Sequence, residues 1–202
     1  MKLYFSPGAC SLSPHIVLLE AGLPHTTEKV DLRSKKTAAG IDFRSINPKG
    51  YVPALELDGG ELLTEGPAIT EYLADLAPEK NLAPAAGTMP RYHMISWLNF
   101  ISTEVHKNYS PLFSPDASED LKAGARSRLA DRYGYLNTVL AGRDYLLDSG
   151  YSLADIYLFV VSNWAGMVKV DLTPFPHVMA LVQRVSVRPA VQEALRAEGL
   201  IK

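Results

Sequence analysis

The sequence predicts an α/β amino-terminal domain with a mixed four-stranded sheet, followed by an all-α helical domain. Three observations lead to this prediction. Strand-like and helix-like segments alternate through residues 1–80, a proline-rich stretch follows them, and the remainder shows only helical periodicity. We therefore expect domains at residues 1–80 and 90–202, joined by a linker at residues 81–89.

The first domain opens with a short strand, a turn and a helix. Residues 3–5 are apolar, and Pro7-Gly8 is a turn signal, because proline presets its φ angle and glycine accepts angles that other residues avoid. A helix follows through residues 16–19 and is expected to end at Gly22-Leu23-Pro24. Pro14 suits its first turn, where a missing N–H costs nothing.

Three further strands are expected at residues 26–32, 51–57 and 61–63. The sequence Asp-Gly-Gly at residues 58–60 is a strong hairpin signal between the last two. A short helix at residues 41–46 and a longer one that opens at residues 64–67 complete the domain. The element order predicts a mixed sheet that is too small for a doubly wound fold.

The second domain is predicted from amphipathic spacing. Between residues 92 and 107, apolar side chains recur at helical intervals and form one stripe, which consists of Met94, Trp97, Leu98, Ile101 and Val105. A polar stripe lies on roughly the opposite side and consists of Asn99, Thr103 and His106. Further helices are expected after residue 119, through about residue 164, and over residues 176–187 and 189–197.

Two capping boxes are predicted in this helical part. Asp116 and Glu119 have the spacing of one. Ser152 and Asp155 have the spacing of another, with Tyr151 and Ile156 at the positions of a hydrophobic staple. We assign Asp155 to folding rather than catalysis, because the capping box explains it.

Composition excludes several classes of protein. The 202 residues are 47% hydrophobic and 21% charged, as expected of a globular chain, and the net charge of -2 argues against electrostatic binding of nucleic acid. One cysteine excludes an intramolecular disulfide and fits a reducing compartment. We find no signal peptide, membrane-spanning run or metal-ligand cluster, and expect a soluble, cytoplasmic protein.

Cys10 is the first candidate for chemistry. It lies where the first strand leads into the amino terminus of the first helix, and the partial positive charge there favours thiolate over thiol. The alternative is that Cys10 is a small buried hydrophobe without reactivity.

Several motifs resemble the glutathione transferases, and closely the bacterial beta class. They are SPGACSL at residues 6–12, NPKGYVPAL at 47–55, LTEGPAI at 63–69, WLNFI at 97–101, EVHK at 104–107 and AD at 154–155. Together they span essentially the whole chain, and their spacing is also similar to beta-class enzymes found with aromatic-pollutant degradation. The resemblance implies a thioredoxin-like first domain, a helical second domain, glutathione as co-substrate, no metal, and a homodimer.

The resemblance also implies how the first domain binds glutathione. Cys10 would face the glutathione sulfur, and the backbone of Val52 would pair with the peptide like an added strand, with Pro53 in the cis form. Ser11, adjacent to Cys10, is the main rival hydroxyl. An ordinary strand entry is the alternative for Val52-Pro53.

Charged and backbone groups would hold the ends of glutathione. Glu65 can bind the ammonium group, and backbone N–H groups from Gly66 onward can bind the γ-glutamyl carboxylate. Lys35 can meet a carboxylate or carbonyl of the peptide, although the choice between it and the adjacent Lys36 depends on register. The alternatives are a helix-capping role for Glu65 and a solvated side chain for Lys35.

The polar stripe of the second domain completes the predicted site. In the family, the face that corresponds to Asn99, Thr103 and His106 looks toward the thiol. His106 is thus a candidate to stabilise a thiolate or to transfer a proton, and Lys107 could add positive charge.

These residues support three hypotheses about function. The first is an enzyme that directs the sulfur of glutathione to small hydrophobic electrophiles. The second uses Cys10 in a mixed disulfide for thiol exchange, peroxide reduction or dehalogenation, with glutathione supplying the second thiol. The third is a non-catalytic ligand-binding or regulatory protein on the same scaffold. We expect variable residues around 109–113 and 164–168 to shape the electrophile pocket.

Overall fold

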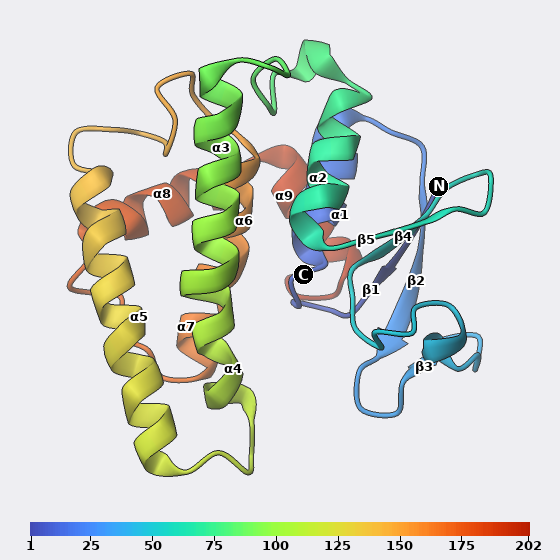
Figure 1. Ribbon diagram of the computed structural model, residues 1–202, viewed down its shortest axis with the longest axis horizontal. Coiled ribbons are helices and arrows are strands. Elements are labelled where there is room, and N and C mark those ends of the chain that lie inside the picture. Colours follow the sequence, from blue (N-terminus) through green and yellow to red (C-terminus); the bar gives the residue numbers. More distant parts are fainter. The chain divides into compact units, whose positions relative to one another are not determined.

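The computed structural model describes residues 1–202 and divides into two compact units. The first unit consists of residues 1–83 and 188–202, and the second of residues 84–187 (Figure 1). Residues 188–202 follow the helical part in sequence, but they pack with the α/β part. The division into compact units places the carboxy-terminal segment in the first unit. The predicted boundaries of the two domains and of the linker stay predictions.

The first unit contains a mixed sheet with the strand order β3-β2-β1-β4-β5. Its strands are β1(Lys2–Phe5), β2(Thr26–Asp31), β3(Lys36–Thr37), β4(Ala54–Glu56) and β5(Leu62–Thr64). β1 and β2 are parallel, and the other pairs are antiparallel. The prediction of four strands is wrong by one, because β3 has only two residues and too few to show alternation.

The two faces of the sheet pack against different partners. Successive residues of a strand point to opposite faces of a sheet. Tyr4 and its partner Ala54 therefore lie on one face, and Leu3 and its partner Leu55 lie on the other. Tyr4 and Ala54 pack in a buried cluster with Phe43, which belongs to the short helix η1(Phe43–Ser45). The helices of this unit are α1(Leu12–Ala21), α2(Gly66–Asp75), the short η2(Pro78–Lys80) and α9(Pro189–Ala197).

Helix α1 contacts both α2 and α9, which makes it the centre of the helical layer of this unit. Gly22 ends α1 in the left-handed conformation, as the sequence predicts. The predicted hairpin turn is also confirmed: Gly60, with φ of 83°, donates its N–H to the Leu57 carbonyl at 2.8 Å.

The second unit is entirely helical (Figure 1). Its helices are α3(Met89–Phe100), η3(Ile101–His106), α4(Lys107–Phe113), α5(Glu119–Val139), α6(Leu153–Ser162), α7(Trp164–Met167) and α8(Pro176–Ser186). Every residue of α6 is buried, and α6 contacts α3, η3, α7 and α8, so it forms the core of the unit. None of the helices in the structure is long and apolar enough to cross a membrane.

Two predictions about helix geometry need correction. The helix expected over residues 92–107 contains a π-helical segment, η3, whose wider turn changes the spacing on which the polar stripe was based. The cap of α5 is Ser118 rather than Asp116, because the Ser118 hydroxyl accepts from the N–H of Leu121. The capping box of Ser152 and Asp155 is confirmed.

Candidate functional site

Cys10 lies in the loop between β1 and α1, just before the Ser11 cap of the helix. Its side chain is partly buried, and its thiol donates a hydrogen bond to the carbonyl of Val52, with 3.3 Å between Sγ and O. The single thiol of the chain thus lies directly against the backbone on which the resemblance places a bound peptide.

The structure corrects the expectation that Cys10 is a thiolate. Burial raises the pKa of Cys10 to about 12, and the carboxylate of Glu65 acts in the same direction. The backbone N–H groups of Cys10 and Ser11 lower this pKa, but they do not outweigh the burial. In the ligand-free protein Cys10 is therefore a thiol and a hydrogen-bond donor at neutral pH.

The rival hydroxyl of Ser11 has a structural role. Ser11 is fully buried, accepts a hydrogen bond from the N–H of Ser6 at 3.1 Å, and donates one to the carbonyl of Ser6 at 3.3 Å. These bonds fold the loop that carries Cys10. The phenol of Tyr4 donates to Glu56 at 2.6 Å and packs on Phe43, on the face described above.

The segment before β4 presents its backbone next to Cys10. The Val52–Pro53 peptide bond is cis. Asn47, which is buried, donates to the Tyr51 carbonyl at 2.8 Å, and Lys35 donates to the Gly50 carbonyl at 2.8 Å. Lys35 therefore shapes the loop next to Val52. Asn47 was missed as a site residue, although the motif NPKGYVPAL begins with it.

Glu65 occupies an unusual backbone conformation at the start of α2. Its φ angle is 73°, in the left-handed region that glycine favours. Its carboxylate accepts hydrogen bonds from Lys49 and, at 3.0 Å, from Tyr51. The bond from Lys49 lowers the pKa of Glu65, so this group is an anion. A ligand ammonium group would find a carboxylate already oriented by two donors, neither of which was predicted.

Gly66 begins α2, so its N–H lies at the positive end of the helix. A Cβ atom on Gly66 would lie 3.8 Å from the ring of Pro53, which is ordinary contact distance. The contact places the start of α2 beside the cis proline. Cys10, Val52, Pro53, Glu65 and Gly66 thus come together in the first unit, as the resemblance implies.

The polar stripe belongs to the second unit. Asn99 and Thr103 are exposed, and the Thr103 hydroxyl donates to the Asn99 carbonyl at 3.1 Å. His106 lies in η3, with its Nδ1 atom 2.6 Å from the Tyr157 hydroxyl and its ring centroid 4.7 Å from that of Trp164. Tyr157 was not predicted, because it lies 51 residues from His106 in sequence.

His106 is uncharged at neutral pH. Burial, with a smaller contribution from the charge of Lys107, lowers the pKa of His106 to about 4. The side chain can donate or accept a hydrogen bond and can transfer a proton, but it supplies no positive charge to a thiolate. Lys107 itself is exposed.

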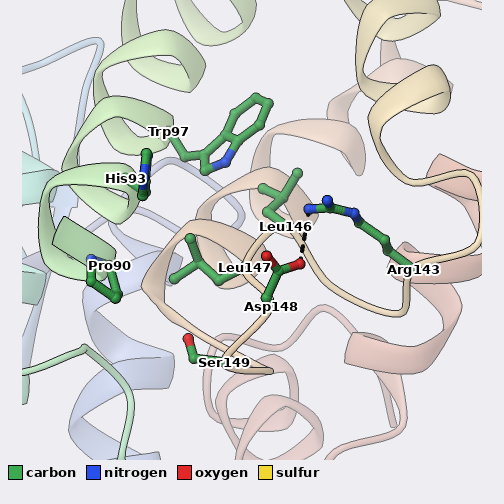
Figure 2. A pocket seen from close by; sticks show the side chains of 8 residues that line it. All are labelled: Pro90, His93, Trp97, Arg143, Leu146, Leu147, Asp148 and Ser149. Atoms are coloured by element: carbon green, nitrogen blue, oxygen red, sulfur yellow. Dashed lines mark ion pairs between the residues drawn. The ribbon is translucent and has the colours of Figure 1, made fainter.

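The second unit also has a cavity of about 280 Å³ (Figure 2). The side chains of His93 and Trp97, both from α3, line one side, and the segment after α5 lines the other with Leu146, Leu147 and the ion pair Arg143–Asp148 at 3.1 Å. None of the predicted site residues lines this cavity, so it contributes nothing to the chemistry above.

No three His, Cys, Asp or Glu side chains are grouped as metal ligands would be.

Family models match both parts of the chain: "Glutathione S-transferase, N-terminal domain" matches residues 8–76, and "Glutathione S-transferase, C-terminal domain" matches residues 89–189.

Individual relatives agree with the family models. Glutathione S-transferase GstA of Escherichia coli O157:H7 is 46% identical over 99% of this chain and 100% of its own. A bacterial beta-class glutathione S-transferase of Sphingomonas chungbukensis superimposes with a TM-score of 0.97 at 46% identity, covering 100% of both chains. A sphingomonad glutathione S-transferase complexed with glutathione superimposes with a TM-score of 0.96 at 48% identity, again over 100% of both chains.

Proposed function

Because the chain belongs to the glutathione S-transferase family, in its bacterial beta class, we propose that it transfers glutathione to small hydrophobic electrophiles. The observation that carries the proposal is the hydrogen bond from Cys10 to the Val52 carbonyl, at 3.3 Å. It puts the thiol beside a backbone segment that can pair with an extended peptide. Glu65 and the N–H of Gly66 lie at the start of α2, where they suit the ammonium and carboxylate of the γ-glutamyl group.

In the proposed reaction, glutathione provides the nucleophile and Cys10 stays a thiol. The glutathione thiol loses its proton to solvent, its sulfur forms a bond to the electrophilic carbon, and the leaving group departs with the electron pair of the broken bond. When glutathione is bound, the S–H of Cys10 turns from the Val52 carbonyl to the glutathione sulfur and stabilises its negative charge. This role suits a group whose pKa is raised to about 12, whereas a mixed-disulfide cycle needs Cys10 as a thiolate.

The remaining roles rest on the family resemblance. We assign Lys35, Asn99, Thr103 and His106 to glutathione binding. The neutral imidazole of His106 also relays the proton of the glutathione thiol to solvent. A cytoplasmic homodimer completes the proposal, and sedimentation equilibrium of the purified chain tests the dimer.

Calorimetric titration with reduced glutathione tests the binding site. We expect saturable binding, and an affinity about tenfold weaker in Glu65→Gln, which keeps the size of the side chain but loses the charge. Glu61→Gln is the matched control, because Glu61 is an exposed carboxylate just before β5 and its substitution should leave affinity unchanged. No binding by the wild-type protein would overturn the proposed function.

Cys10→Ala separates the two enzymatic hypotheses. If Cys10 only donates a hydrogen bond, the variant still conjugates a halodinitrobenzene, with kcat reduced on the order of tenfold. Mass spectrometry after incubation with oxidised glutathione provides the second readout. A stoichiometric glutathione adduct on wild-type Cys10, together with complete loss of conjugation in Cys10→Ala, would favour the mixed-disulfide mechanism instead.

A further inference from the structure

Both ends of the carboxy-terminal segment, residues 188–202, contact the α/β part of the first unit. At the start of α9, Arg188 forms a two-pronged ion pair with Glu20 of α1, with N–O distances of 2.6 and 3.1 Å. Helix α9 then packs along α1. This packing directs the end of α9 toward the loop that precedes α1.

A Schellman motif ends α9 and orients the last residues. The N–H of Leu200 donates to the carbonyl of Leu195 at 2.8 Å, and the N–H of Gly199 donates to Arg196 at 2.9 Å. Gly199 has the left-handed φ of 72° that this motif needs. The turn fixes the position of Glu198, the residue before it.

The carboxyl group of Glu198 lies in the core of the first unit. Its side chain is 0% exposed, a rare placement for a glutamate. Oε2 accepts a hydrogen bond from the N–H of Gly8 at 2.8 Å, and Oε1 lies 2.9 Å from Nδ1 of His15. A buried carboxyl group is costly unless it is hydrogen-bonded, and here each oxygen has a partner.

Gly8 is a residue of the turn that leads to Cys10. The N–H of Ala9 donates to the carbonyl of Ser6 at 3.0 Å, and Gly8 itself has a left-handed φ of 70°. On its other side, Gly8 lies against Leu200, whose Cδ2 would be 3.4 Å from a Cβ on Gly8. The carboxy-terminal segment thus holds this turn by one hydrogen bond and one apolar contact, two residues before the thiol.

We propose that Glu198 is a positioning residue for Cys10: it fixes the backbone of Gly8 and thereby the place of the thiol beside Val52. The catalytic meaning of this role rests on the proposed function, but the positioning itself does not. Glu198 lies in the segment that follows the helical unit in sequence, and nothing in its local spacing indicates a link to the first loop.

Alkylation of Cys10 by iodoacetamide tests the positioning without glutathione, and the chain has no other cysteine to react. In Glu198→Ala the loop is released and the thiol is less buried, so we expect the alkylation rate to rise about fivefold or more. Glu198→Gln retains an oxygen acceptor for the Gly8 N–H and should stay within about twofold of the wild-type rate.

Glu20→Gln is the matched control for a merely structural role. It weakens the ion pair between Glu20 and Arg188 at the start of α9, and it does not change the Cys10 loop. We expect Glu20→Gln to lower the melting temperature while its alkylation rate and its kcat/KM for glutathione stay within about twofold of wild type. In Glu198→Ala, kcat/KM should fall on the order of tenfold at temperatures where the protein is fully folded.

Equal alkylation rates in Glu198→Ala and Glu20→Gln would overturn the proposal. If Glu198→Ala does not fold, amide hydrogen exchange of the wild-type protein decides: the Gly8 amide should be as protected as the amides of α1, and exchange at the rate of an exposed loop would contradict the positioning. If wild type binds no glutathione while alkylation changes as expected, the proposed function fails and the positioning role stands.

Discussion

Asp155 and Glu198 are both buried carboxyl groups, but their hydrogen-bond partners give them different roles in the two units. Asp155 accepts from the N–H and the hydroxyl of Ser152, both at 2.9 Å, and from the N–H of Leu146 at 2.8 Å. Its partners lie within nine residues. Glu198 binds Gly8 and His15, which lie 190 and 183 residues away. Asp155 starts its own helix, whereas Glu198 joins the two ends of the first unit.

The difference predicts which measurement each residue affects. Loss of Asp155 should change stability and leave the reactivity of Cys10 as it is. Loss of Glu198 should change both.

Asp155→Ala has the largest expected effect. The substitution leaves the buried N–H groups of Leu146 and Ser152 without acceptors, so the free energy of unfolding should fall by about 3–5 kcal/mol. Urea denaturation measures the loss. Asp148→Ala, at a residue whose side chain is 86% exposed, should cost less than about 1 kcal/mol. A loss below that value in Asp155→Ala would contradict the folding role.

The next largest expected effect is the change in the free energy of unfolding with pH. Burial raises the pKa of Asp155 from 3.8 to about 6, so between these values the folded protein binds a proton that the unfolded chain has released. The contribution of Asp155 is therefore full below about pH 4 and declines as pH rises through 6, by on the order of 3 kcal/mol.

Asp155→Asn lacks this titration. The free energy of unfolding of wild type minus that of Asp155→Asn, measured from about pH 4 to pH 7, should fall by that amount as pH rises. A constant difference would show that the Asp155 pKa is not raised by folding.

Gly8→Ala has a smaller expected effect and sharpens the comparison from the side of the loop. A left-handed φ costs an alanine about 1–2 kcal/mol, and the added Cβ meets Leu200 at 3.4 Å. Gly40→Ala is the matched control, because Gly40 has φ of 84° and nothing within 4 Å of the added Cβ. Both variants should lose similar stability in thermal denaturation, but only Gly8→Ala should change the alkylation rate of Cys10.

Local signals were sufficient for much of the fold. The Ser152–Asp155 box, the Gly22 stop and the hairpin turn before Gly60 each depend on residues close in sequence, and the structure confirms all three. Local signals failed where a segment was too short, as in β3, or where two caps compete, as at Asp116 and Ser118.

The site was predictable only through the family resemblance, because its parts are far apart in sequence. No spacing rule joins Cys10 to Val52, His106 to Tyr157, or Gly8 to Glu198. The thiolate expectation failed for a related reason. A helix terminus can be found in a sequence, but the burial that raises the pKa of Cys10 depends on the whole fold.

Protection of Cys10 by a thiol-free analogue of glutathione tests the account most directly. S-methylglutathione cannot react with iodoacetamide as a thiol, and the chain has one cysteine, so the alkylation rate reports only on Cys10. If the peptide lies along Val52 with its sulfur at Cys10, saturating S-methylglutathione should slow alkylation about tenfold in wild type, and the protection should need higher concentrations in Glu65→Gln. An alkylation rate that stays the same with S-methylglutathione present would contradict a glutathione site at Cys10.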